Sequence, residues 1–86
     1  MPHDELARLR RGIDSLDRRI GALLARRFAL AREIKLKKLR PGASDPARER
    51  AVLANAAAAA GGGRFGAAAR AVYGEVLRQA KRLQKC

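Results

Sequence analysis

The first half of the chain carries a heptad repeat of apolar residues that is interrupted by one cation. Steps of four and three residues alternate through eight positions: Leu9, Ile13, Leu16, Ile20, Leu23, Arg27, Leu30 and Ile34. This spacing places the eight side chains on one face of an α-helix and is typical of helices that pack along another helix. Arg27 stands where the repeat calls for a buried aliphatic side chain. Because an unpaired charge inside a protein is costly, we expect an anion to bind Arg27.

A second cation shares the face of Arg27. Lys38 lies eleven residues further along the chain, and eleven helical steps return to within about 20° of the same face. The rise between the two residues is about 16 Å, a gap that two long side chains can narrow to the size of a small organic anion. The spacing therefore predicts a site for a compact dianion.

One long helix is expected to carry this face, from about Asp4 or Glu5 to about Leu39, with acids near its start and lysines near its end. A rod of roughly 35 residues cannot bury its own apolar stripe, and two shorter helices would cover only part of it. A second copy of the rod is the natural cover. Oligomerisation also suits a chain of 86 residues, because a short chain buries only about 60% of its unfolded surface.

A second helix is expected after a break at residues 40–44, which contain a Pro-Gly pair. Asp45 is the predicted N-cap and Pro46 the first helical residue, and the helix runs to about Ala60. Its apolar face comprises Glu49, Val52, Leu53, Ala56 and Ala60. The acid at the head of this face binds a ligand, or is a first-turn acid favoured by the helix dipole, or pairs with Arg48 or a nearby lysine.

A third helix is expected from about Phe65 to Lys85, after a linker of three glycines at 61–63. Gly66 is expected to loosen its start. The helix carries two adjoining apolar rows, which are Phe65, Ala69, Val72, Val76 and Leu83, and Tyr73, Leu77, Ala80 and Gln84. Gln84 is thus a polar residue at the end of an apolar row.

Composition limits the classes of partner. The formal net charge of +12 favours anionic partners, and the basic segment Lys35, Lys37, Lys38 and Arg40 could bind phosphate. However, the cations are spread over the whole chain, and its aromatic residues are one Tyr and two Phe. Since no helix-turn-helix, zinc or RNA-binding motif is present, the sequence argues against nucleic-acid binding.

Cysteine and histidine are each present once, as Cys86 and His3. They offer no intrachain disulfide and no ligand cluster for a metal. The sequence has no apolar run of membrane-spanning length and no hydrophobic leader. We therefore expect no membrane segment and a cytoplasmic protein.

Four polar residues from the three helices are expected to face inward: Arg27, Lys38, Glu49 and Gln84. Two cations, one acceptor and one amide can line a site for a hydroxylated dicarboxylate. The set contains no nucleophile with a base, no metal-ligand spacing and no phosphate-binding loop. An enzyme with this site needs no metal or cofactor, and acts by holding a substrate conformation and stabilising charge.

A set of short motifs extends over nearly the whole chain: Leu9-Arg10, Ile13-Asp14-Ser15-Leu16-Asp17, Leu23-Leu24-Ala25-Arg26-Arg27, Ile34 with Lys38, Asp45-Pro46-Ala47-Arg48-Glu49-Arg50, and Gln84. Together they resemble the all-helical class of chorismate mutases. The resemblance implies a single domain over residues 1–86, an all-α three-helix protomer and an intertwined six-helix homodimer. It also implies the rearrangement of chorismate to prephenate, which feeds phenylalanine and tyrosine synthesis.

The resemblance gives catalytic roles to Arg27, Lys38 and Gln84. Arg27 and the partner's Arg10 would clamp the two carboxylates of chorismate. Lys38 would bind a carboxylate and the ether oxygen, to which Gln84 would also donate. One point follows from geometry alone: Arg10 precedes Arg27 by 17 residues, about 25 Å along one helix, so it can join that site only from another chain.

The remaining substrate-binding roles fall on the second and third helices. Glu49 would accept a hydrogen bond from the ring hydroxyl, and Asp45 and Arg48 would line or support the site. Ala80 falls where relatives often carry a serine that contacts a substrate carboxylate, so one contact of the family is missing there. The turn before Asp45 is also shorter than in many relatives.

Other functions remain open. An isochorismate-pyruvate lyase of the same fold would use similar contacts from Arg27, Lys38 and Gln84, although the Arg48-Glu49 pair suits a ring hydroxyl, as in the mutases. Alternatively, the chain is a non-catalytic basic helical module that docks on a partner enzyme or binds nucleic acid. Turnover by the isolated chain would exclude a purely docking role, and a steep salt dependence of binding would mark a nucleic-acid binder.

Overall fold

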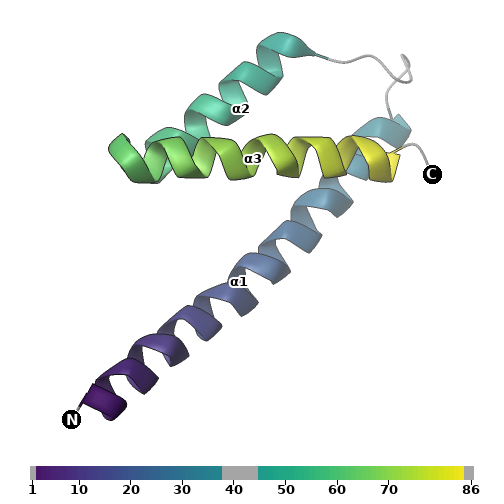
Figure 1. Ribbon diagram of the computed structural model, residues 1–86. Helices are drawn as coiled ribbons and strands as arrows, with labels where there is room; N and C mark the ends of the chain where they lie inside the picture. Colours follow the sequence, from purple (N-terminus) through teal and green to yellow (C-terminus); the bar gives the residue numbers. More distant parts are fainter. Residues whose placement is uncertain (1, 38–44, 85–86) are drawn as a thin grey trace. The chain divides into compact units, whose positions relative to one another are not determined.

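Three α-helices make up the described part of the chain. The computed structural model describes residues 2–37 and 45–84, and no strand occurs among them. Helix α1 spans Pro2–Lys37, α2 spans Pro46–Ala59 and α3 spans Gly63–Gln84 (Figure 1). The prediction of an all-α protein with a long first helix is confirmed.

Helix α1 has 36 residues, with acids in its first turn and lysines in its last turn, as the helix dipole favours. It begins at Pro2, slightly earlier than predicted, because proline fits the first turn, where its missing N–H is not needed. The predicted end near Leu39, the break at 40–44 and Cys86 lie outside the described residues. Contacts divide the chain into two compact units, Met1–Leu30 and Ala31–Cys86.

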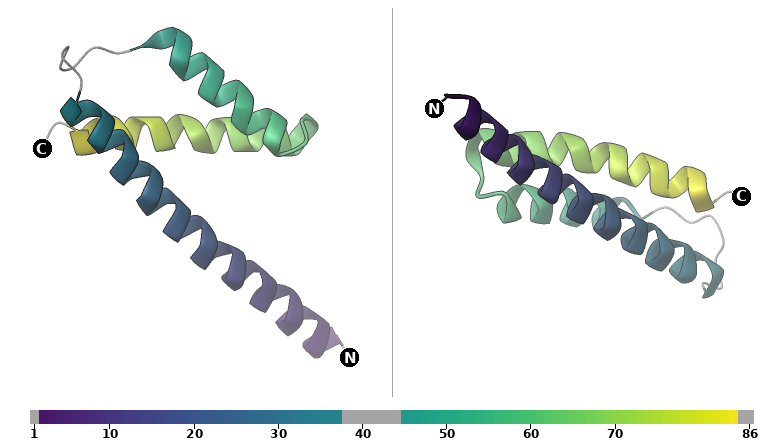
Figure 2. Two further views of the ribbon diagram at one scale, coloured as in Figure 1. Left: turned by 180° about the vertical axis from the view of Figure 1, so that it is seen from behind. Right: turned by 90° about the horizontal axis from the view of Figure 1, so that it is seen from below.

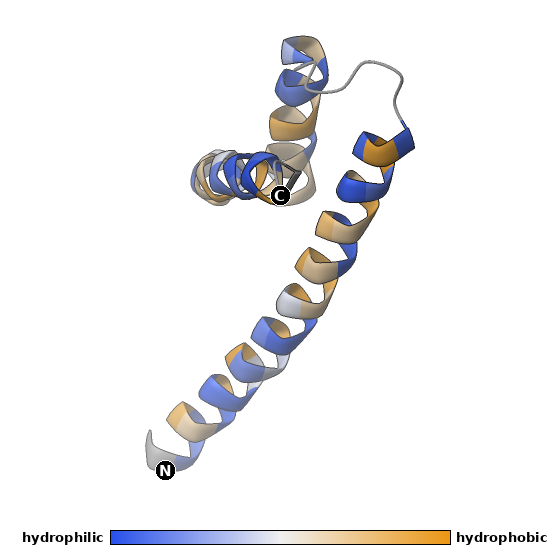
Figure 3. Cartoon of the chain, turned by 90° about the vertical axis from the view of Figure 1, so that its right-hand side faces the viewer, coloured by the Kyte–Doolittle hydropathy of each residue, from blue (hydrophilic) through white to orange (hydrophobic). Residues whose placement is uncertain are grey.

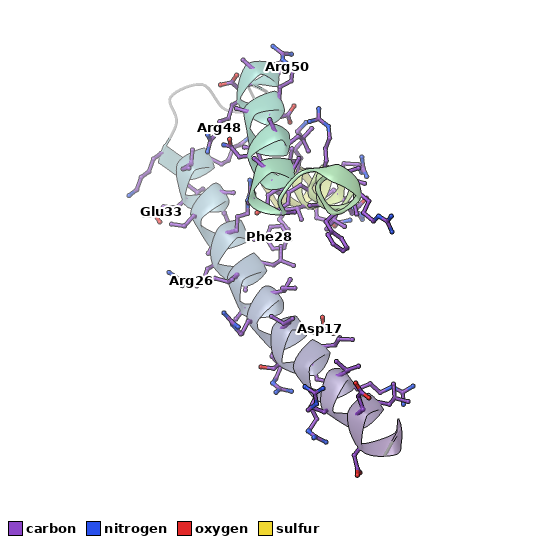
Figure 4. All side chains as sticks on the ribbon, turned by 90° about the vertical axis from the view of Figure 1, so that its left-hand side faces the viewer. Asp17, Arg26, Phe28, Glu33, Arg48 and Arg50 are labelled. Atoms are coloured by element: carbon purple, nitrogen blue, oxygen red, sulfur yellow. The ribbon has the colours of Figure 1, made fainter. Side chains whose placement is uncertain are left out.

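The apolar face of α1 is open to solvent in the single chain. The seven aliphatic members of the heptad are each between 51% and 59% exposed. Apolar segments recur along α1 in Figure 3, and the charged Asp17 and Arg26 project to different sides of the helix (Figure 4). An apolar face of this length is typical of a protein-interaction surface.

Helices α2 and α3 form a hairpin and pack directly on each other. Its core comprises Val52 of α2 with Val76 and Ala80 of α3. The predicted apolar face of α2 is confirmed, since Val52 is buried and its other members, Glu49, Leu53, Ala56 and Ala60, are half-buried. The two helices meet at the glycine turn and diverge away from it (Figures 1 and 2).

The three glycines after α2 form a defined turn and not only a linker. The backbone N–H of Gly62 donates to the carbonyl of Ala57 (3.0 Å), and that of Gly61 donates to the carbonyl of Ala58 (2.9 Å). This pair of bonds is a Schellman motif, which satisfies carbonyls at the end of a helix. Gly61, Gly62 and Gly63 have φ values of 88°, 71° and 58°, a region that other residues adopt only with strain.

The expectation that Gly66 loosens the start of α3 is wrong. Gly66 is a buried residue inside α3, and a Cβ added to it would lie 2.9 Å from the carbonyl oxygen of Ala57. That oxygen is the same one that accepts from Gly62 in the Schellman motif. The missing side chain therefore lets the backbones of α2 and α3 approach closely, and this packing role has no signature in the sequence of α3 alone.

Helix α3 buries only part of its apolar surface in the hairpin. Val76 and Ala80 are buried, and Tyr73 and Leu77 are half-buried. Phe65, Val72 and Leu83, which share a predicted row with Val76, remain 72%, 62% and 47% exposed. A second apolar strip is thus open in the single chain.

Within the described residues, no helix has the length and apolar character needed to cross a membrane.

The close contact at Gly66 predicts that replacing this glycine by alanine destabilises the protein, although helix propensity alone favours alanine. Gly66→Ala should lower the free energy of unfolding by about 1–3 kcal/mol, because the added methyl meets backbone that cannot move aside. Urea denaturation followed by circular dichroism measures the change.

Gly74→Ala is the matched control in the same helix. Its new Cβ would have only the Arg78 side chain nearby, at 3.9 Å, so this variant should gain up to about 1 kcal/mol from helix propensity. An equal gain in both variants would contradict the close approach at Gly66.

Candidate active site

An ion pair joins the first turns of α2 to the last turns of α3. The Oε1 atom of Glu49 and the Nζ atom of Lys81 are 2.5 Å apart, and the two side chains are 29% and 52% exposed. Among the described residues, further ion pairs join side chains three or four residues apart within the same helix: Arg8 with Glu5 and Lys37 with Glu33 in α1, and Arg78 with Glu75 in α3. Glu49, which its place on the α2 face predicts to be an inward-facing polar residue, is thus held by a second helix.

Asp45 caps α2, as predicted. Its Oδ1 atom accepts a hydrogen bond from the backbone N–H of Arg48 (3.0 Å), and its carbonyl accepts one from the N–H of Glu49 (2.9 Å). These bonds fix the first turn, from which Glu49 extends. The side chains of Arg48 and Arg50 are exposed on the same helix (Figure 4). A contact of Asp45 or Arg48 with substrate remains a prediction.

Two predicted cations lie on α1. Arg10 is exposed, whereas Arg27 is half-buried and is therefore better covered than the aliphatic members of its heptad. Its neighbours Leu24, Phe28 and Ala31 are also half-buried. The most covered part of the helix is thus the part that carries the predicted anion-binding arginine.

Two of the predicted catalytic side chains fall outside the described residues. Lys38 lies wholly outside them, and Gln84 is described only as the last residue of α3. Ala80, one turn before Gln84, is 6% exposed and belongs to the hairpin core. The structure therefore brings Glu49 together with the turn of α3 that contains Ala80 and leads to Gln84.

Lys81 was not predicted from the sequence. It lies outside both apolar rows of α3, among several other cations, and no motif marks it. Its pairing with Glu49 depends on how α2 folds back on α3, which periodicity does not encode. The available signal was the acid at the head of the α2 face, for which pairing with Arg48 or a nearby lysine was one of the alternatives.

Other charged groups in the described part of the chain do not form a second site. Glu75 accepts hydrogen bonds from Gln79 (2.7 Å) and Arg78 (3.0 Å), which lower the pKa of its carboxyl by stabilising the charged form. All three residues belong to α3 and are joined only along that helix. Among the described residues, no three His, Cys, Asp or Glu side chains gather as metal ligands.

A comparison with protein families identifies the class of this three-helix protein. The family model of chorismate mutase type II matches residues 9–85, a span that contains every predicted site residue from Arg10 to Gln84. The chain therefore belongs to the chorismate mutase type II family. Searches of curated proteins and of solved structures gave no match.

The cap at Asp45 predicts a difference between two substitutions. Asp45→Ala should lower the free energy of unfolding by about 1 kcal/mol, whereas Asp45→Asn should change it by no more than about 0.5 kcal/mol, because asparagine caps as well as aspartate. Thermal unfolding of both variants measures the difference. Equal losses would show that the charge of Asp45, rather than its capping bond, stabilises α2.

Proposed function

We propose that this chain is a chorismate mutase that converts chorismate to prephenate. The observation that carries the proposal is the family match over residues 9–85, because this span includes all eight positions that the resemblance assigns to the substrate. The half-buried Arg27 and the Glu49 held at the open end of the hairpin support it. The product belongs to phenylalanine and tyrosine synthesis.

The reaction needs no acid, base or nucleophile. One C–O bond of chorismate breaks while one C–C bond forms, and the flexible substrate must first adopt a compact, chair-like conformation. Arg27 and the partner's Arg10 hold this conformation by binding the two carboxylates. Glu49 accepts a hydrogen bond from the ring hydroxyl and so fixes the other side of the substrate.

Charge stabilisation supplies the rest of the rate gain. Negative charge grows on the ether oxygen as its bond to carbon lengthens, and Lys38 with Gln84 donates to that oxygen most strongly in the transition state. A gain of about 10⁶-fold requires about 8 kcal/mol. Restriction of the conformation and two preorganised donors are sufficient for this amount.

The active unit is proposed to be a homodimer in which the two copies form one intertwined domain over residues 1–86. The exposed heptad face of α1 and the exposed strip on α3 support a second copy as the cover. If two α1 helices pair antiparallel about a two-fold axis near Ile20, the partner's Arg10 falls opposite residue 30, between Arg27 and Lys38. Each of the two sites then uses both chains.

Arg27→Ala should abolish most of the activity. Removal of the guanidinium should lower kcat/KM at least about 100-fold, since one charge-stabilising donor typically contributes that much. Arg27→Lys should be intermediate, because lysine retains the charge but loses the two-pronged contact. Loss of chorismate absorbance, with prephenate confirmed as product, measures the effect, and turnover unaffected by Arg27→Ala would contradict the proposed site.

Mixing two inactive variants tests the shared site. If Arg10 acts across the interface, a heterodimer of Arg10→Ala and Arg27→Ala contains one site with both arginines intact. Joint refolding of equal amounts should restore about a quarter of the parent activity, because half of the dimers are mixed and each has one whole site. Each variant refolded alone is the control, and the absence of any recovery would show that the two arginines do not meet across two chains.

A further inference from the structure

Lys81 is a charged group of the hairpin that neither the family motifs nor the proposed mechanism uses. Its ammonium lies 2.5 Å from the Glu49 carboxylate, and the two residues come from different helices. The helices diverge from the glycine turn toward this end of the hairpin (Figure 1). The pair therefore spans the open end, and both side chains must extend toward each other to form it.

Glu49 is held at two points. The capped first turn of α2 fixes its backbone through the bonds of Asp45, and Lys81 fixes the far end of its side chain. A glutamate side chain has three rotatable bonds, and a carboxylate in one orientation requires such an anchor. Within the described part of the chain, Lys81 is the partner that the structure gives to this carboxylate.

The electrostatics of the proposed substrate make this anchor significant. Chorismate carries two carboxylates, and an ionised Glu49 beside it adds a third negative charge that repels them. An ammonium at 2.5 Å offsets that charge. It also leaves Oε2 of Glu49 available, since a carboxylate has lone pairs on both oxygens while Lys81 contacts Oε1.

We propose that Lys81 is a positioning residue that orients Glu49 toward the ring hydroxyl of the substrate and offsets its charge. This inference rests on the proposed function. Ala80, the preceding residue, is buried and offers only a methyl group, whereas the side chain of Lys81 reaches the carboxylate of Glu49. Lys81 thereby makes the chain selective for substrates with a free ring hydroxyl.

The test compares two substrates within each protein preparation. Chorismate has a free ring hydroxyl that can donate to Glu49, and its methyl ether at that oxygen cannot. The ratio of kcat/KM for the two substrates does not depend on the fraction of folded enzyme. Lys81→Met should reduce this ratio roughly tenfold relative to the parent, whereas Lys81→Arg, which retains a cation, should keep it within about twofold of the parent.

Two further variants separate positioning from general effects of charge and stability. Arg78→Met removes a cation from the same helix together with its pair to Glu75, and should leave the ratio unchanged. In the background Glu49→Ala, adding Lys81→Met should change kcat/KM less than about twofold, because coupled residues are not additive. Thermal unfolding of each variant records any change in stability separately.

The outcomes distinguish this inference from the proposed function. If the parent converts chorismate but Lys81→Met leaves the substrate ratio unchanged, or adds its full effect to that of Glu49→Ala, Lys81 is only an inter-helix ion pair and the inference is overturned. If the parent does not convert chorismate at all, the proposed function fails and the inference fails with it. If Lys81→Met reduces the substrate ratio and Lys81→Arg keeps the parent ratio, both the inference and the proposed function are supported.

Discussion

The hairpin depends on one close approach of backbone to backbone. Gly66 of α3 lies against the carbonyl of Ala57, which also closes the Schellman motif at the end of α2. Only a residue without a side chain fits there without a shift of the backbone. From this contact the two helices diverge, so the same geometry that packs Val52 against α3 also leaves the distance that Glu49 and Lys81 span.

The long α1 helix presents a different constraint, because a single helix cannot bury its own apolar face. A face of seven aliphatic side chains, each more than half exposed, is costly to leave in water, at roughly 25 cal/mol per Å². Arg27 interrupts this face at a position that is less exposed than its aliphatic neighbours. In the proposed dimer, one surface therefore serves both helix packing and anion binding. Such a surface is sufficient for a reaction that requires only a fixed substrate conformation and stabilised charge.

Local patterns predicted most of the fold, whereas contacts between distant residues did not emerge from them. Periodicity, the Asp45-Pro46 start and the glycine run gave three helices with bounds close to those observed, since each signal acts within a few residues. The roles of Gly66 and Lys81 escaped prediction because each depends on the other helix of the hairpin. The place of Glu49 on the α2 face and the cap at Asp45 were predicted correctly as local features. The substrate contacts of the candidate site remain predictions for every residue, Glu49 and Asp45 included.

Of the described helices, α2 is the shortest, with 14 residues, and Val52 is its buried side chain. Most of its other side chains are single methyl groups, so α2 gains little from burial and an isolated helix of this length is marginal in water. Glu49 lies near the start of α2, and a ligand that binds the Glu49 carboxylate also stabilises this helix. If chorismate binds Glu49 as proposed, occupancy of the site and folding of α2 are linked equilibria, and the bound substrate raises the population of folded α2 by mass action.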